Sequence, residues 1–142
     1  MIAVTDIQFK DFSVEVKTTL ATLAQNVLEE VGGELESAVK RNTAVDTGQT
    51  KNAWTHRVEQ MDGGYSAIVG NPLQNAIWEE FGTGDYALNG NGRKGGWFYR
   101  DEEGKGHFTH GKHPRRPLFK AYTTMKNKII KRIQNVFKGG LK

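Results

Sequence analysis

Apolar residues recur every three or four positions along the first forty residues of the chain, which is the spacing of one face of an α-helix. The stripe runs from Phe12 to Val39 and predicts an amphipathic helix that ends near residue 40. Gly32 and Gly33 interrupt this stripe. Because glycine inside a helix costs about 1 kcal/mol relative to alanine, a kink or break is predicted at the pair.

A tight corner is predicted directly after this helix, at Val45, Asp46, Thr47 and Gly48. The short side chains of the aspartate and threonine can accept hydrogen bonds from backbone amides, and the glycine can adopt a positive φ. The corner is therefore predicted to cap a short helical turn over residues 49–53.

A β-hairpin is predicted next, because two short runs that can alternate flank a turn sequence. The runs cover residues 54–61 and 65–70, and the turn between them reads Asp62, Gly63, Gly64. The structure expected here is a pair of antiparallel strands.

A short helix is predicted to begin at the Asn-Pro pair at residues 71–72, a cap followed by proline, and to end at Gly82. Phe81 on this helix is predicted to lie in the core, together with Trp54, against the terminal helices. Glu80 beside it is predicted to accept hydrogen bonds from the backbone amides of the corner.

The chain then becomes rich in glycine before a final amphipathic stripe begins. Residues 85–96 show no periodicity and are predicted to be a mobile loop. A second hairpin is predicted from the aromatic runs, with an exposed charged tip at residues 101–106. A Pro-Arg-Arg-Pro run that ends at Pro117 opens the predicted C-terminal helix, and a Gly-Gly pair closes it.

Together these elements predict an α+β fold in which a small antiparallel sheet of hairpins packs against long N-terminal and C-terminal helices. A length of 142 residues suits one domain, residues 1–142, with the mobile loop at 85–96 and a hairpin arm at 97–110. No apolar run approaches the ~20 residues of a membrane span, and the first residues lack the blocks of a signal peptide, so we expect no membrane association and no export. The absence of cysteine excludes disulfides and thiolate ligands.

The net charge of +4 is distributed unevenly. Residues 117–142 carry seven basic side chains and no acidic one, whereas residues 1–40 carry seven acidic and three basic side chains. The basic end favours nucleic-acid binding, a solvated helix face, or a contact between the acidic and basic helices within a subunit or between neighbours.

The candidate chemistry is sparse. His107, His110 and His113 are spaced by three, but residues three apart on a strand point to opposite faces, so no metal site is predicted. The adjacent carboxylates at residues 79–80 and 102–103 do not converge either. We therefore predict neither catalytic residues nor a cofactor. The alternative is a small basic nucleic-acid-binding protein or ribonuclease-type toxin that would use His107, His110, Arg115 and Arg116 with the lysine-rich helix.

Several short motifs, in this order and spacing, resemble a known family. They are Val45-Asp46-Thr47-Gly48, Ile68-Val69-Gly70, the run from Ala76 to Gly84, Trp97-Phe98-Tyr99 with His107-Phe108-Thr109-His110-Gly111, and the run from Arg116 to Ala121. The chain is similar to the tail-completion or head-tail joining proteins of tailed bacteriophages with long flexible tails, a minor tail-component family. The motif positions carried over as structural are Val45, Asp46, Thr47, Gly48, Glu80, Phe81, Gly82, Thr83, Pro117 and Leu118.

The resemblance implies a small subunit that forms a ring in the neck, six-fold favoured and twelve-fold possible, between the tail tube and the DNA-filled head. It implies no catalysis and no cofactor, partners among other neck and tail proteins, synthesis in the host cytoplasm and a final place in the virion. It leaves DNA contact open. The residues expected to contact neighbouring subunits or adjacent rings are Asp85, Tyr86, Arg93, Lys94, Asp101, Glu102 and Glu103.

Overall fold

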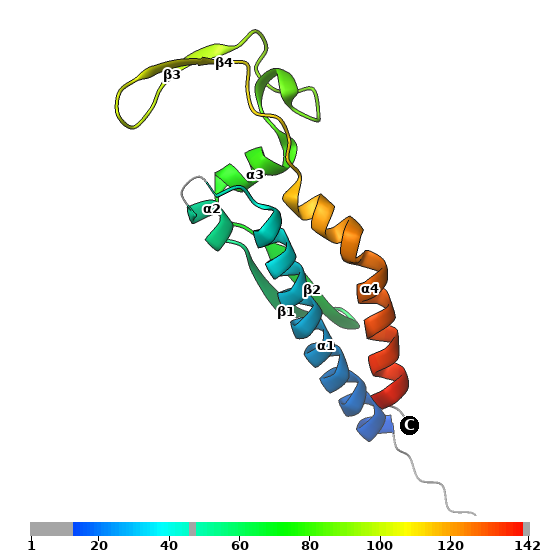
Figure 1. Cartoon of the computed structure of the whole chain (residues 1–142). Helices are drawn as coiled ribbons and strands as arrows, with labels where there is room; N and C mark the ends of the chain where they lie inside the picture. The colour runs from blue at the N-terminus through cyan, green and yellow to red at the C-terminus, as the bar shows by residue number, and fades with distance from the viewer. Residues whose placement is uncertain (1–12, 46–47, 141–142) are drawn as a thin grey trace, which may run out of the picture.

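The computed structural model describes residues 13–45 and 48–140. Two long helices lie side by side, a β-hairpin packs against the first of them, and a second hairpin projects from the far end (Figure 1). In chain order the elements are α1 (Ser13–Asn42), α2 (Gln49–Asn52), β1 (Thr55–Met61), β2 (Gly64–Gly70), α3 (Gln74–Phe81), the 3₁₀ turn η1 (Gly84–Tyr86), β3 (Trp97–Arg100), β4 (Gly106–Thr109) and α4 (Pro117–Gly140). This arrangement confirms the predicted α+β class with long terminal helices.

The two hairpins form separate two-stranded sheets. In the first, Thr55 pairs with Gly70 and Met61 with Gly64, and both strands contact α1. In the second, Trp97 pairs with Thr109 and Arg100 with Gly106. The single small sheet of the prediction is therefore divided into a packed hairpin and an arm.

α1 continues through Gly32 and Gly33, so of the predicted kink or break the break is wrong. The glycines are instead the place where β1 approaches the helix, because a Cβ on Gly32 would lie 3.0 Å from Cδ2 of His56. The ring of His56 is held from the helix side, with Nε2 2.7 Å from Glu29 and Nδ1 3.5 Å from Glu36. The hydrogen bond to Glu29 raises the pKa of His56 above its usual value, partial burial opposes the shift, and Glu36 adds to it.

α4 runs antiparallel to α1, and Gly140 at its end packs against Leu23. Arg132 forms ion pairs with Glu30 and, at 2.9 Å, with Glu34. The acidic helix α1 and the basic helix α4 are therefore in contact within one subunit, which is one of the three interpretations of the charge pattern.

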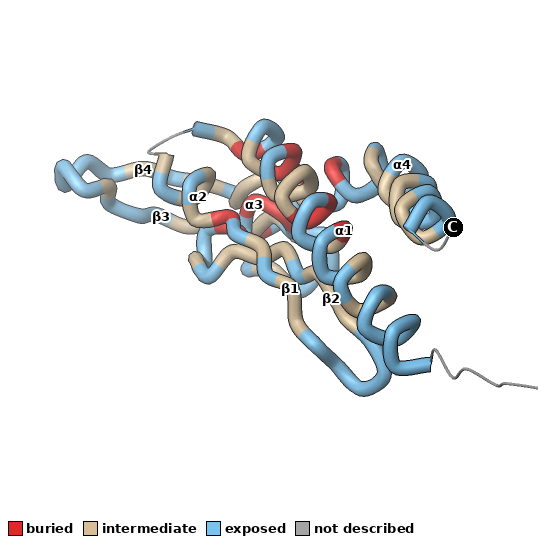
Figure 2. Tube along the Cα trace, turned by 90° about the horizontal axis from the view of Figure 1, so that it is seen from below, coloured by how far each residue is buried: buried red, intermediate tan, exposed pale blue. Residues whose placement is uncertain are grey.

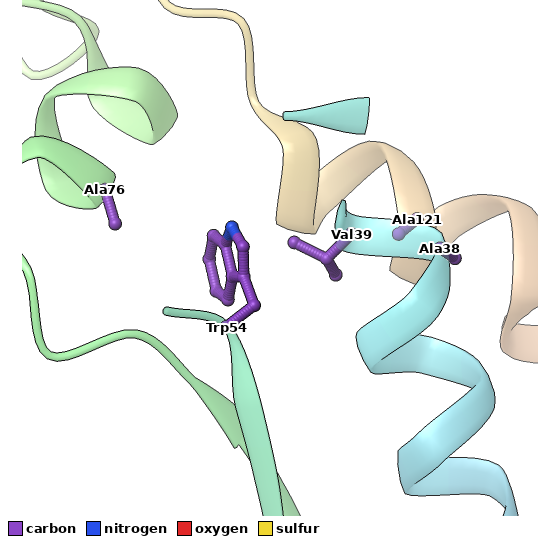
Figure 3. Packing of buried hydrophobic residues seen from close by; sticks show 5 residues of the cluster. All are labelled: Ala38, Val39, Trp54, Ala76 and Ala121. Atoms are coloured by element: carbon purple, nitrogen blue, oxygen red, sulfur yellow. The ribbon is translucent and has the colours of Figure 1, made fainter. Parts of the chain in front are cut away.

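The core is small and centres on Trp54, which is 4% exposed and packs with Ala38, Val39, Ala76 and Ala121 (Figure 3). Its indole N–H donates to the hydroxyl of Thr43 at 2.9 Å, and that hydroxyl donates to the carbonyl of Val39 at 2.7 Å. Figure 2 shows buried residues concentrated where α1, α3 and the start of α4 meet. The prediction for Trp54 is thus confirmed.

Two predictions about α3 are wrong. Phe81 is 42% exposed rather than in the core, because α4 stands away from β2 and leaves the ring at the edge of an open cleft. The helix begins at Gln74, not at the Asn-Pro pair. The side chain of Asn71 accepts a hydrogen bond from the amide of Leu73 at 2.9 Å, which makes a turn before the helix rather than a cap on it.

Candidate functional site

The corner before α2 contains the positive φ that was predicted for Gly48. Gly48 adopts φ 77°, and its carbonyl accepts a hydrogen bond from the amide of Asn52 at 2.9 Å. Val45 is exposed. Asp46 and Thr47 lie outside the described residues, so their role as caps stays a prediction.

Glu80 connects α3 to the start of α4. Its carboxylate is buried and accepts hydrogen bonds from the amides of Leu118 at 2.9 Å and Phe119 at 3.0 Å. The first amides of a helix have no partner within the helix, and Pro117 at the first position has no N–H to offer. Glu80 therefore caps α4 from another element, which corrects the prediction that it binds the amides of the corner.

Glu79 holds the chain segment that leads into α4. The residue is 4% exposed and forms an ion pair with Lys112, while its carbonyl accepts the amides of Arg115 at 2.8 Å and Arg116 at 3.2 Å. Its second carboxylate oxygen is buried without a hydrogen-bond partner among the described residues. The two adjacent glutamates thus bind different segments, as the geometry of a helix requires.

A close approach of two backbone segments forms the base of the arm. Thr83 donates its amide to the carbonyl of Lys112 at 2.9 Å, and the hydroxyl of Thr83 accepts the amide of Lys112 at 2.8 Å. Gly82 and Gly84 have positive φ, and a Cβ on either would lie 2.8 Å or less from a backbone carbonyl of the returning chain. Only glycine fits these two positions, so the Gly-Thr-Gly motif fixes the direction in which the arm leaves the body.

Two histidine–aspartate pairs stabilise the arm. His107 Nε2 lies 2.8 Å from Asp101, and His110 Nδ1 lies 3.0 Å from Asp85. In each case the histidine hydrogen bond is the main reason that the pKa of the aspartate is lowered, with backbone amides contributing further. Because His107 and His110 bind separate carboxylates, they do not form a shared site.

The loop that was predicted to be mobile folds back on the body. Its first residues belong to η1, and the amide of Leu88 donates a hydrogen bond to the carbonyl of Phe81 at 2.9 Å. Tyr86 stacks on His113 with ring centroids 3.7 Å apart, and the guanidinium of Arg93 lies 5.5 Å from the ring centre of Trp97. The mobility of the loop stays a prediction.

The predicted interface residues are mostly accessible to a partner. Of these residues, Asp85, Tyr86, Arg93, Lys94, Glu102 and Glu103 are exposed, and Asp101 is half-buried. The more prominent feature of the arm is Phe98, which is 80% exposed and lies directly opposite Phe108 across the strand pair. The sequence analysis used the aromatic runs to predict the hairpin and did not single out Phe98.

An apolar cleft of about 680 Å³ lies between β2, α3 and α4, with α1 at its base. The lining residues are mainly apolar and include Val31, Val69, Ile77, Phe119, Ile129 and Ile133. Among the described residues that line it, Glu80 and Arg116 are the charged ones; Glu80 binds the amides of α4, and the guanidinium of Arg116 lies 3.8 Å from the ring centre of Phe119. The cleft was not predicted, because it depends on the gap between β2 and α4.

Residues 13–45 and 48–140 contain no cluster of three or more histidine, aspartate or glutamate side chains placed to hold a metal ion. Within the same ranges, no helix has the length and apolar character needed to cross a membrane.

The described residues thus form a small α+β scaffold with a projecting hairpin arm and an open apolar cleft. A family model described as "Bacteriophage HK97-gp10, putative tail-component" matches residues 7–82, more than half of the chain, and the chain belongs to this family. It is therefore a phage tail component with a structural role, which implies contacts with other tail proteins and a place in the virion. Neither the curated proteins nor the solved structures contained a match to the chain.

Proposed function

We propose that the protein is a ring-forming subunit of the phage neck that completes the tail and joins it to the head, without catalysis. The observation that supports this most directly is the arm. The Gly-Thr-Gly base holds the hairpin of β3 and β4 away from the body, where it shares few contacts with the rest of the chain (Figure 1). A projecting element of this kind suits assembly, because its exposed surface can be buried only by a partner.

The arrangement of surfaces also favours a ring over a two-fold dimer. The arm and the cleft are different surfaces on different sides of one subunit. A contact between unlike surfaces that is not reciprocated leaves one of each free on every pair, so the contact repeats and gives a ring where its rotation closes. Six-fold symmetry is the favoured outcome of this proposal, with twelve-fold as the alternative.

The decisive experiment removes the protein from the phage and images the particles by electron microscopy. A neck function predicts full heads and separate tails of normal length, and supplying the intact chain in trans should restore joined particles. Tails of altered length, or joined particles without the protein, would refute a role at the head-tail junction.

Contact with DNA is a second candidate function, supported by α4. This helix carries six basic side chains and no acidic one, and no ion pair joins its five lysines to a carboxylate in the described parts of the chain. Such a surface binds nucleic acid with an affinity that falls steeply with salt. Binding of double-stranded DNA that is lost between low and physiological salt, and reduced by replacing Lys128 and Lys131 with glutamine, would support it; salt-independent or absent binding would exclude it.

The ribonuclease alternative receives less support from the geometry. His107 and His110 are each engaged by an aspartate, and Arg116 lies against Phe119. Turnover of an RNA substrate that is abolished by His107→Gln and His110→Gln would establish it in place of a structural role.

A further inference from the structure

We propose that the apolar cleft of one subunit receives the aromatic arm of a second copy of this chain. This inference rests on the proposed ring and identifies the two surfaces that would form each of its contacts. The arm and the cleft are two apolar surfaces that the fold of the described residues leaves open.

The arm carries its most exposed apolar group on one face. Phe98 and Phe108 are direct partners across β3 and β4, so both point to the same side of the hairpin, and their rings lie 4.9 Å apart. Phe98 is 80% exposed and Phe108 50% exposed. On the opposite face Tyr99 stacks on His107 at 5.2 Å, so part of that face is already occupied within the arm.

The cleft has the apolar lining and the length to bind this face. Its α4 wall runs from Leu118 to Ile133, which is about 22 Å along a helix. Each strand of the arm has four residues and spans about 13 Å. The aromatic face of the arm is therefore shorter than the wall along which it would lie.

The charges next to the two surfaces are complementary. Glu102 and Glu103 are exposed at the tip of the arm, beyond the aromatic pair. Lys126 is exposed on α4, and its Nζ lies 6.0 Å from the ring centre of Tyr122, which lines the cleft. An acidic tip that lies along a basic helix would set the direction in which the arm enters.

The arm of a subunit cannot occupy the cleft of the same subunit. It leaves the body beyond the N-terminal end of α4 and points away from this helix, so it does not run along the α4 wall of the cleft (Figure 1). The close backbone contacts at Gly82 and Gly84 hold it in that direction. An arm that occupies the cleft must therefore come from another chain.

The test uses the absence of native cysteine. Ile129→Cys places a single thiol in the cleft wall, and a benzophenone maleimide is attached to it. Particles are assembled from a mixture of unlabelled and ¹⁵N-labelled chains and are then irradiated to cross-link the benzophenone to its neighbour. Ile130→Cys is the matched control, because Ile130 follows on the same helix, is 45% exposed and does not line the cleft. The expected product joins the benzophenone at position 129 of one isotopic form to residues 97–109 of the other, with little product from position 130.

Other products would overturn the inference and say what fills the cleft instead. A link to residues 1–12 assigns the cleft to the N-terminal segment of a copy, and a link to a different tail protein assigns it to that protein. A link only within one isotopic form, or none, shows that no second copy enters. Particles that contain rings but give no cross-link to the arm refute the arm–cleft contact and are consistent with the proposed ring. Particles without rings refute both the contact and the ring.

A second pair of variants tests the aromatic face itself. Phe98→Ser should reduce the yield of the arm product roughly 10- to 100-fold, the factor expected when one buried aromatic side chain is lost from an apolar contact. Tyr99→Ser on the other face should reduce it much less. Equal effects of the two substitutions would contradict the orientation proposed here.

Discussion

Replacing Glu80 with glutamine should destabilise the protein by about 2–4 kcal/mol, although the side chains are almost equal in size. The carboxylate accepts two amides of the first turn of α4, from Leu118 and Phe119, at 2.9 and 3.0 Å. The glutamine oxygen can accept one of them, while its NH₂ group faces the other donor. An unsatisfied buried amide costs about 1–3 kcal/mol, and loss of the negative charge at a helix N-terminus costs about 0.3–2 kcal/mol more.

The free energy of unfolding is measured by urea denaturation, with Glu102→Gln at the exposed tip of the arm as the control. The midpoint should fall for Glu80→Gln with little change in slope, while the control stays within about 0.5 kcal/mol of the native chain. Hydrogen exchange should also accelerate at the amides of Leu118 and Phe119. If Glu80→Gln unfolds within about 0.5 kcal/mol of the native chain, the carboxylate does not cap α4 and the reasoning fails.

Three further predictions concern α1 and the core. Gly32→Ala should lower the free energy of unfolding by about 1 kcal/mol, because the new Cβ would lie 3.0 Å from the ring of His56. Gly33→Ala should raise it by about 0.5–1 kcal/mol, because the new Cβ has an ordinary contact of 3.6 Å and alanine favours the helix. Urea midpoints that shift in the same direction for both variants would refute this. Because the pKa of His56 is raised by Glu29, its stabilising effect should be full below about pH 6.5 and be lost as the pH rises through the folded-state pKa. Unfolding measured from about pH 5.5 to about pH 8.5 should show a difference between His56→Gln and the native chain that shrinks with pH; a constant difference would contradict it. Trp54→Phe should cost about 2–3 kcal/mol through a lost hydrogen bond and a small cavity, and a thermal midpoint equal to that of the native chain would show that the indole is not in the core.

The features that sequence predicted well depend on neighbours in the chain. The stripe that begins at Phe12 predicted a helix to residue 40, and α1 ends at Asn42. The turn chemistry around Gly63, with φ 76°, and around Gly104, with φ 83°, predicted both hairpins. Helical periodicity and turn conformation are properties of a few consecutive residues, so they can be predicted from the sequence without knowledge of the fold.

The features that sequence missed depend on which elements meet. Glu80 was recognised as unusual, but its partners are 38 and 39 residues away, and no local pattern identifies them. Gly32 reads as a helix breaker until His56 is placed against it. Phe81 reads as a core residue because its exposure depends on the separation of α4 from β2.

The contacts of Glu79 and Glu80 join the part of the chain that matches the family to the part that lies beyond the match. The match stops at Gly82, where the chain leaves α3 for the arm. Glu79 and Glu80 are the last charged residues before that point, and they bind Lys112 and the start of α4 in the part of the chain beyond the match. α3 thus holds the start of α4 against the matched scaffold, while α1 packs along the rest of the helix. It follows that Glu80→Gln should weaken the proposed arm contact even at temperatures where the protein remains folded, since the cap that it removes positions one wall of the cleft.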